Sequence, residues 1–234
     1  MTRVAGADGT PGGWAVVIMD ADRSIVRKVR ALSEVFDGAA DLDILAIDVP
    51  IGLLDTYEVG GRACDRAARK LLDRRRSSVF PAPVRPVLAS KSWDDACVRS
   101  RASGPRGKAI SKQTFAILPK IEEVDRLLQM RPELRDVVRE VHPEVCFSEL
   151  VGHPMTHRKA SSQGRAERRR ALRLCFPDLG VIENAGRVQG LPIEDILDAA
   201  VACWSALRLA VGAGRSLPSA VPLDSTGLPM AIWV

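Results

Sequence analysis

Aromatic residues are scarce in this chain of 234 residues, at 4% of the composition. An interface on which successive bases stack against a series of exposed rings is therefore not expected. The cysteines are scattered and form no C-x-x-C pair, so the sequence predicts neither a disulfide framework nor a zinc site and fits a reducing, cytoplasmic environment. No secretory signal and no apolar run of about 18 residues occurs, so no membrane span is expected. The five cysteines are Cys64, Cys97, Cys146, Cys175 and Cys203.

The remaining composition is that of an ordinary soluble protein, with 46% hydrophobic and 27% charged residues. A chain of this length can bury a substantial core as a single domain over residues 1–234 with one sizeable insertion. The net charge of +5 favours a polyanionic partner such as DNA or RNA, although charge alone does not establish one.

The opening stretch, residues 4–20, predicts a β-hairpin because two apolar runs flank a Gly-rich turn. Asp8 ends a first strand that is too apolar to lie anywhere but in the middle of a sheet. A carboxylate there is costly unless something compensates it, which makes Asp8 a candidate site residue. The alternative is ordinary turn chemistry, since the side chain of an Asp-Gly turn accepts backbone hydrogen bonds.

Two further strands are expected after the hairpin. Residues 24–32 alternate apolar and basic side chains, as a half-exposed third strand does, and residues 33–40 suggest a short helix. Residues 43–49 predict a buried fourth strand that carries Asp48 near its end. Since parallel neighbouring strands have their carboxyl ends at one edge, Asp48 is expected near Asp8; the alternative is that Asp48 only caps a turn.

Residues 50–130 predict a helical elaboration after the fourth strand, with helices over 61–73, 90–103 and 112–129, the last interrupted near Pro119. Arg62 and Arg69 share one face of the first of these helices, and an Arg triplet with two serines follows it. Both features suit phosphate oxygens. A solvated salt-bridge face is, however, the commoner role of such a pattern.

The next segment, residues 137–150, is expected to return to strand structure, with Pro143 at a bend or an end. His142 and Glu144 flank this proline; a lone His is usually structural, and Glu144 is interpretable as an ordinary exposed acid. Residues 161–176 predict a strongly basic helix that is either solvated or in contact with nucleic acid, and residues 226–234 a short terminal strand.

Residues 192–211 form the clearest predicted helix of the chain. Pro192 suits its first turn, and Asp195 is favoured at the positive end of the helix dipole. Asp198 is not explained in this way, because it lies one turn further in, among apolar residues, and projects roughly 60° from Asp195 around the axis. Small neighbours such as Ala199 would let the helix approach a sheet closely.

Two strand-end acids and an acid pair on the last helix together predict a metal site. Clustered carboxylates repel one another, so they persist with cations between them. Ligands that are all oxygen favour Mg²⁺ or Mn²⁺ over zinc. Two such ions about 4 Å apart can clamp the attacking and leaving oxygens in phosphodiester cleavage.

Three segments carry a family resemblance: V-A-G-A-D-G-T-P-G-G-W-A-V-V, L-A-I-D-V-P and D-I-L-D-A-A-V-A. They resemble the opening strand–turn–strand, the strand-four acid (Glu in RuvC enzymes) and the closing helix of the RNase H-like superfamily, in particular RuvC-type resolvases and their YqgF relatives. The chain is more closely similar to an uncharacterised domain family expected to consist of nucleases of this fold. The motifs shared with that family run from residue 6 to about 204. They include G-x-D-G-x-x-G-G-W, I-D-V-P-I-G-L, R-x-C-D-x-x-A-R, R-S-S-V-F, S-K-Q and H-P-E-V-C-F.

The resemblance implies an α/β fold with a five-stranded mixed sheet, its first three strands antiparallel, and helices on both faces. It implies Asp8, Asp48 and Asp198 as catalytic metal ligands, with Asp195 as a fourth ligand. Glu144 lies in an H-P-E motif that RuvC enzymes do not share in this form, so it is either an added catalytic ligand or a substrate contact. RuvC-type enzymes dimerise, which implies a homodimer. The candidate substrate-binding residues are Arg62, Arg69, Arg76, Ser77, Ser78, Lys112 and Gln113.

The leading functional hypothesis is therefore a nuclease that uses two Mg²⁺ or Mn²⁺ ions to hydrolyse DNA or RNA. A non-catalytic nucleic-acid-binding module that kept the fold is the second hypothesis. The third is an actin-like ATPase or sugar kinase, whose opening Asp-Gly-Thr turn looks similar. Those proteins carry a second phosphate-binding turn, for which the sequence at 224–227 is a poor substitute.

Overall fold

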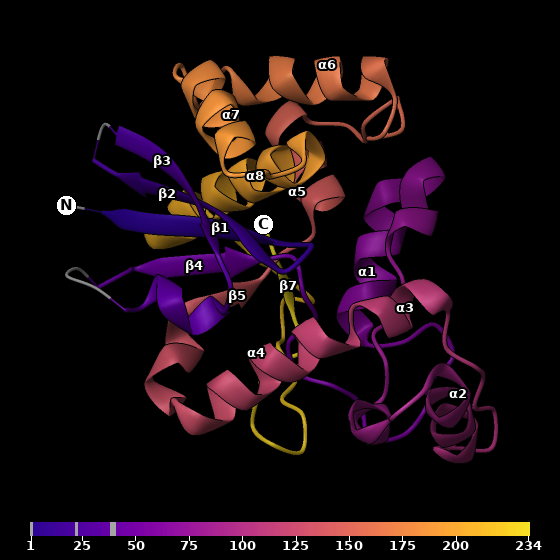
Figure 1. The fold of residues 1–234 in the computed structure, drawn as a ribbon. Helices are drawn as coiled ribbons and strands as arrows, with labels where there is room; N and C mark the ends of the chain where they lie inside the picture. Colours follow the sequence, from indigo (N-terminus) through magenta and orange to yellow (C-terminus); the bar gives the residue numbers. More distant parts are fainter. Residues whose placement is uncertain (1, 22, 38–40) are drawn as a thin grey trace.

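The computed structural model describes residues 2–21, 23–37 and 41–234. A five-stranded mixed sheet in the order β3-β2-β1-β4-β5 forms its centre (Figure 1). Strands β1, β2 and β3 are antiparallel, whereas β4 runs parallel to β1 and β5 runs parallel to β4. The strands are β1 (Arg3–Thr10), β2 (Gly13–Asp20), β3 (Arg23–Val29), β4 (Ile44–Ile47) and β5 (Val138–Glu140).

The α/β class, the mixed sheet and the antiparallel order of the first three strands agree with the sequence prediction. In the hairpin, Thr10 pairs with Gly13, and Gly12 has a φ of 74° that an L side chain would rarely adopt. Because the turn is so short, the two strands stay in register along their whole length, with Arg3 opposite Asp20.

One face of the sheet is covered by the long helix α8 (Ile193–Ala210), which packs across β1, β2 and β4. Gly6 makes this contact possible: a Cβ at this position would lie 2.0 Å from the Cys203 nitrogen and 2.2 Å from the Ala199 oxygen. Helix and strand backbones therefore touch, as the small residues of the helix led us to expect. Helices α5 (Pro143–Val151) and α6 (Ser162–Leu172) pack against α8, and α7 (Leu179–Val188) contacts both α8 and strand β3 (Figure 1).

The opposite face of the sheet packs on α4 (Leu118–Met130), which lies below the sheet in Figure 1. Alternate residues of β1 and β2 point to this side, so Ala7 and Trp14 join a core that contains Ile121 and Val124 of α4. The Trp14 indole Nε1 also donates a hydrogen bond to Glu123. Strands β1, β2 and β4 are thus buried on both faces, whereas most residues of the edge strand β3 are exposed or half-buried.

The chain between β4 and β5 is largely helical, as predicted. It contains α1 (Ala63–Leu72), α2 (Trp93–Ala102), α3 (Lys112–Ala116) and α4, with short 3-10 turns η2 (Asp73–Ser78), η3 (Arg85–Ala89) and η4 (Pro132–Asp136). The break near Pro119 is real, since α3 ends before Ile117 and the proline lies in the first turn of α4. In the described residues, no helix has the length and apolarity needed to cross a membrane.

The prediction of a strand over 137–150 is wrong beyond β5. Pro143 begins helix α5 and does not bend or end a strand, and the apolar run that follows is a buried helix. A short apolar run cannot be distinguished by its periodicity from a buried helix turn, and a proline suits the first turn of a helix.

Other boundaries also differ. The third strand stops at Val29, and a 3-10 turn, η1 (Leu32–Val35), begins within the predicted strand; the predicted helix over 33–40 ends partly outside the described residues. Helix α7 was not predicted. The terminal strand shortens to β7 (Ile232–Trp233), which pairs with β6 (Ser216–Leu217).

The outer edge of β3 is covered by one side chain of the segment after α7. The Gln189 side-chain oxygen accepts the Lys28 backbone N–H at 2.8 Å, and its amide nitrogen donates to the Val26 carbonyl oxygen at 3.1 Å. The amide thus pairs with two backbone groups of the edge strand as a neighbouring strand would.

Candidate functional site

Asp8 and Asp48 lie side by side at the carboxyl ends of β1 and β4. The parallel register pairs Ala7 with Ile47, and the Asp48 backbone N–H continues the ladder with a 3.1 Å hydrogen bond to the Ala7 oxygen. The alternation of the strands turns both aspartates toward the face that α8 covers, since Val4 and Ala46 pack on that side. Sequence alternation and strand order alone therefore bring the two acids together.

Asp195 and Asp198 reach the same place from the first turns of α8. Their helix crosses β1 in direct backbone contact at Gly6, two residues before Asp8, and its amino-terminal end lies toward the carboxyl ends of the strands. Asp198 is only 2% exposed and Asp8 only 8%. The close approach that Gly6 permits is what lets a helix residue meet a strand-end residue.

A cavity of about 660 Å³ contains these aspartates. The floor is formed by the ends of β1 and β4 and by α8, and the walls come from η2, the junction of α3 and α4, and the loop before α6. Of the predicted site residues, those that line it are Asp8, Asp48, Asp195, Asp198, Glu144, Arg62, Ser78 and Gln113.

Burial and mutual repulsion make the aspartates hard to ionise. Burial first, and then the charges of Asp48 and Asp198, raise the pKa of Asp8 well above its usual range. Burial raises the pKa of Asp48 to about 6, with His142 opposing the rise and Asp198 adding to it. Burial also raises the pKa values of Asp195 and Asp198. A cation in the cavity would therefore relieve a real electrostatic cost.

One such cation belongs to the chain itself. The Lys159 ammonium lies 2.8 Å from the Asp198 carboxylate, and the Lys159 side chain is 51% exposed at the mouth of the cavity. The negative charge of Asp198 raises the pKa of Lys159, and burial opposes this rise only in part. Lys159 therefore stays charged and compensates part of the aspartate cluster.

His142 lies near Asp48, and its ring is held by the backbone of Ser78 in η2. The His142 Nε2 atom lies 3.2 Å from the Ser78 carbonyl oxygen, which can only accept, so Nε2 carries the proton. The Nδ1 atom is buried and has no hydrogen-bond partner within the described residues. The structure thus gives His142 a fixed orientation, which the sequence left open.

Glu144 points into the same cavity from the first turn of α5, but its charge is already matched. The buried Arg168 guanidinium donates to one carboxylate oxygen of Glu144, and Arg75 lies 3.4 Å from the other. Arg168 belongs to the basic helix α6, and two other arginines of this helix, Arg165 and Arg169, pair with acids of neighbouring helices. Much of the predicted basic surface of this helix is thus used inside the protein.

Arg62 is likewise an internal residue and does not lie on a solvated face. Its guanidinium bonds to Asp65 at 2.8 Å and to Glu140 at 2.6 Å, and it also donates to the Ile51 and Gly52 carbonyl oxygens. These bonds join α1, the end of β5 and the segment after Asp48. Arg62 therefore fixes the backbone on one side of the cavity.

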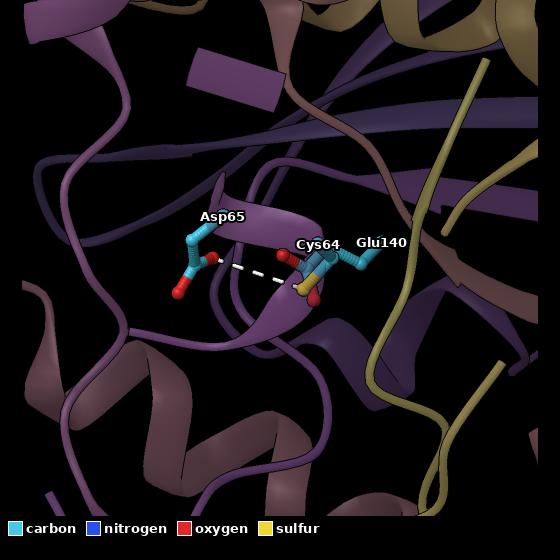
Figure 2. A group of neighbouring side chains, drawn as sticks. All are labelled: Cys64, Asp65 and Glu140. Carbon is cyan, nitrogen blue, oxygen red and sulfur yellow. Dashed lines mark hydrogen bonds between the residues drawn. The ribbon is translucent and has the colours of Figure 1, made fainter. Parts of the chain in front are cut away.

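Cys64, Asp65 and Glu140 form the only set of three potential metal ligands, among the described residues, whose ligand atoms all lie within 4.8 Å of one another (Figure 2). The Cys64 thiol donates a weak hydrogen bond to Asp65, and burial raises its pKa, so it stays protonated. Because the Arg62 guanidinium bridges both carboxylates, it supplies the positive charge there. We interpret this group as a structural ion-pair network.

Four predicted substrate-binding residues do not line the cavity. Arg76 and Ser77 are exposed on η2, and Lys112 is exposed with its ammonium 5.5 Å from the centre of the Trp93 ring. Arg69 is half-buried and bonds to the Gly60 carbonyl oxygen. Arg76, Ser77 and Lys112 are each next in sequence to a residue that lines the cavity, whereas Arg69 serves local structure.

The late turn that begins at Asp224 is also structural. Its carboxylate accepts the Leu53 and Leu228 backbone N–H groups and pairs with Arg85. These bonds fasten the carboxyl-terminal segment to the loop after β4, and the carboxylate has no free side for a phosphate.

Several cavity residues were missed by the sequence analysis. Lys120, Arg158 and Lys159 line the cavity, but no periodic pattern marks them, whereas Arg75, which also lines it, belongs to the Arg triplet that the sequence analysis named. Arg158 and Lys159 lie in the polar loop before α6, where a sequence pattern gives no direction to a side chain. Their proximity to the aspartates depends on how α6 packs against α8.

The fold and the cavity define an α/β protein with an acidic cavity at the carboxyl ends of its parallel strands. The chain belongs to the family described as "Protein of unknown function (DUF429)", whose model matches residues 6–222. Comparisons with curated proteins and with solved structures gave no match.

Proposed function

We propose that this protein is a divalent-metal-dependent nuclease that hydrolyses phosphodiester bonds of DNA or RNA. The observation that carries the proposal is the convergence of Asp8, Asp48, Asp195 and Asp198 on one cavity, with the pKa of each carboxyl raised. Shifted carboxyl groups gathered in a cavity are a common property of catalytic sites. The sheet order, antiparallel through β1 and then parallel, also supports an RNase H-like relationship.

The donor set fits Mg²⁺ or Mn²⁺, because all four side chains offer carboxylate oxygens. No three of these carboxylates, among the described residues, have ligand atoms within 4.8 Å of one another. Each of the two proposed ions would therefore be held by one or two carboxylates with water completing its shell, which is usual for Mg²⁺. Bound divalent ions would supply an activated water and neutralise the charge that develops on the phosphate.

The chain's own residues would bind and orient the substrate. Arg75, Arg158 and Lys159 offer positive charge at the cavity wall for phosphate oxygens. The buried floor limits access of bulk water to Asp8 and Asp198, which strengthens the electrostatic interactions made there. Glu144, already paired with Arg168, would hold the Arg75 side chain near the cavity.

Hydrolysis of single-stranded, duplex and branched DNA and RNA with Mn²⁺ or Mg²⁺ tests the proposal. We expect the variants Asp8→Asn and Asp48→Asn to lose most of the activity, whereas Asp41→Asn, which alters an exposed acid in the loop before β4, should retain it. Activity that is unchanged in both site variants would reject the nuclease. Sedimentation of the same samples would test the proposed homodimer.

The second candidate is a nucleic-acid-binding module without catalysis. The Lys159–Asp198 ion pair favours it, because an internal ammonium already occupies part of the position where a metal would be needed. In that case Mn²⁺ titration would show no binding, whereas binding of nucleic acid would persist and weaken steeply with salt.

A further inference from the structure

The geometry points to a narrower substrate class than nucleic acid in general: the cavity takes one unpaired nucleotide of a single strand. Its phosphate would face the aspartates, and its base would lie against Phe80. This inference rests on the proposed nuclease function, and it adds which form of nucleic acid reaches the site.

Phe80 is the first reason. Among the exposed large apolar side chains of the described residues it is the only aromatic one, at 45% exposure. Phe80 lines the same cavity as Asp8 and Asp198. Ile117, which is 39% exposed, lines this cavity from the junction of α3 and α4. Every base has a flat face that stacks on an aromatic ring whatever the sequence. One exposed ring can stack against one base, so the site suits one nucleotide and not a series of stacked bases.

The depth and size of the cavity are the second reason. The carboxylates of Asp8 and Asp198 lie at the floor, whereas Ser78, Ile117 and Lys159 come from three separate walls. A volume of about 660 Å³ falls in the range of roughly 300–1,000 Å³ that holds one small ligand. Asp8 and Asp198 are only 8% and 2% exposed at this floor, so a phosphate held in the backbone of a stacked, paired duplex would not reach them. A nucleotide must leave the stack to enter.

The basic residues of the wall are the third reason. Arg75 lines the cavity, and its Nε atom is buried without a hydrogen-bond acceptor in the described part of the chain. A buried donor of this kind is costly until an acceptor arrives, and a phosphate oxygen would provide one. Lys159, half exposed on its loop, can turn from Asp198 toward a second phosphate oxygen.

Two circular substrates of the same sequence, without ends, test this inference: a circular single strand and a relaxed closed duplex, each incubated with Mn²⁺. We expect the single strand to be cut and the duplex to stay intact. Phe80→Ala and Phe80→Leu should each raise KM about tenfold with little change in kcat, and Phe80→Trp should preserve KM, because stacking needs a flat ring and not only apolar volume. Leu174→Ala, which alters an exposed apolar residue of another surface, is the control.

A binding measurement separates this inference from the nuclease proposal. Fluorescence anisotropy of a short labelled single strand, with Ca²⁺ in place of Mn²⁺, should show about tenfold weaker binding for Phe80→Ala than for wild type. Cleavage of the closed duplex as fast as the single strand would overturn the inference and leave the nuclease intact. If neither circle is cut but Phe80→Ala weakens binding, the nuclease fails and the nucleotide site stands. Equal binding by Phe80→Ala and wild type would overturn the site.

Discussion

Neutralising Asp48 should stabilise the metal-free protein at alkaline pH, although it removes a proposed ligand. Burial raises the pKa of Asp48 from its ordinary 3.8 to about 6. Between these values the folded state binds more protons than the unfolded chain, so stability falls as the pH rises through this window. At about 1.4 kcal/mol per pKa unit, the full cost of ionising Asp48 in the folded protein is about 3 kcal/mol above pH 7.

The variant Asp48→Asn removes this cost, so we expect it to unfold at a higher urea concentration than wild type at pH 8 in EDTA, by about 1–3 kcal/mol. Near pH 3, where the wild-type carboxyl is mostly protonated in both states, the two proteins should be nearly equal in stability. Asp41→Asn, at an exposed position, should match wild type at both pH values. Saturating Mn²⁺ at pH 8 should stabilise wild type more than Asp48→Asn. A metal-free Asp48→Asn protein that is less stable than wild type at pH 8 would refute the reasoning.

Three further predictions concern the scaffold of the site. Gly6→Ala should lower stability by about 1–3 kcal/mol or more and reduce the melting temperature in calorimetry, because its Cβ would meet the backbone of α8. The control Gly9→Ala, in the same strand, should be tolerated, because the nearest atom to its Cβ is 3.8 Å away. Equal melting temperatures of the two variants would contradict the close contact between Gly6 and α8. Arg168→Met should lower the free energy of unfolding, measured in urea, by about 3–5 kcal/mol, since it leaves Glu144 buried without its main partner. A decrease of less than about 1 kcal/mol would contradict a buried ion pair between Arg168 and Glu144. Cys64→Ser should leave the Mn²⁺ stoichiometry in calorimetric titration unchanged, and the loss of an ion would show that the cluster of Cys64, Asp65 and Glu140 binds metal, against its interpretation as a structural ion-pair network.

Much of the sheet was predictable because its signals are local. The apolar runs around the Gly-rich turn specify β1 and β2, and alternation then decides which face Asp8 occupies. The parallel pairing of β1 with β4 follows from the buried character of both strands and brings Asp48 beside Asp8. The aspartates of α8 could be selected because Asp198 is an acid among apolar neighbours, which the helix dipole does not explain.

The rest depends on contacts that local patterns do not encode. Arg62 meets Glu140 across 78 sequence positions, and no helical periodicity distinguishes this buried arginine from a solvated one. Lys159 reaches Asp198 from an irregular loop. β5 has only three residues, and the apolar residues after Pro143 fit a helix as well as a strand, so its end was misplaced.

The side chain of Gln189 also bears on how the molecule behaves at high concentration. An open strand with free amide and carbonyl groups is a template on which a second molecule can add its own strand. Here one amide occupies the Val26 carbonyl and the Lys28 N–H, so an incoming chain would have to displace it before it could extend the sheet. The Gln189 side chain, which belongs to neither the sheet nor the core, thereby opposes self-association through β3. A substitution at Gln189 that leaves activity unchanged would therefore still carry a risk of aggregation.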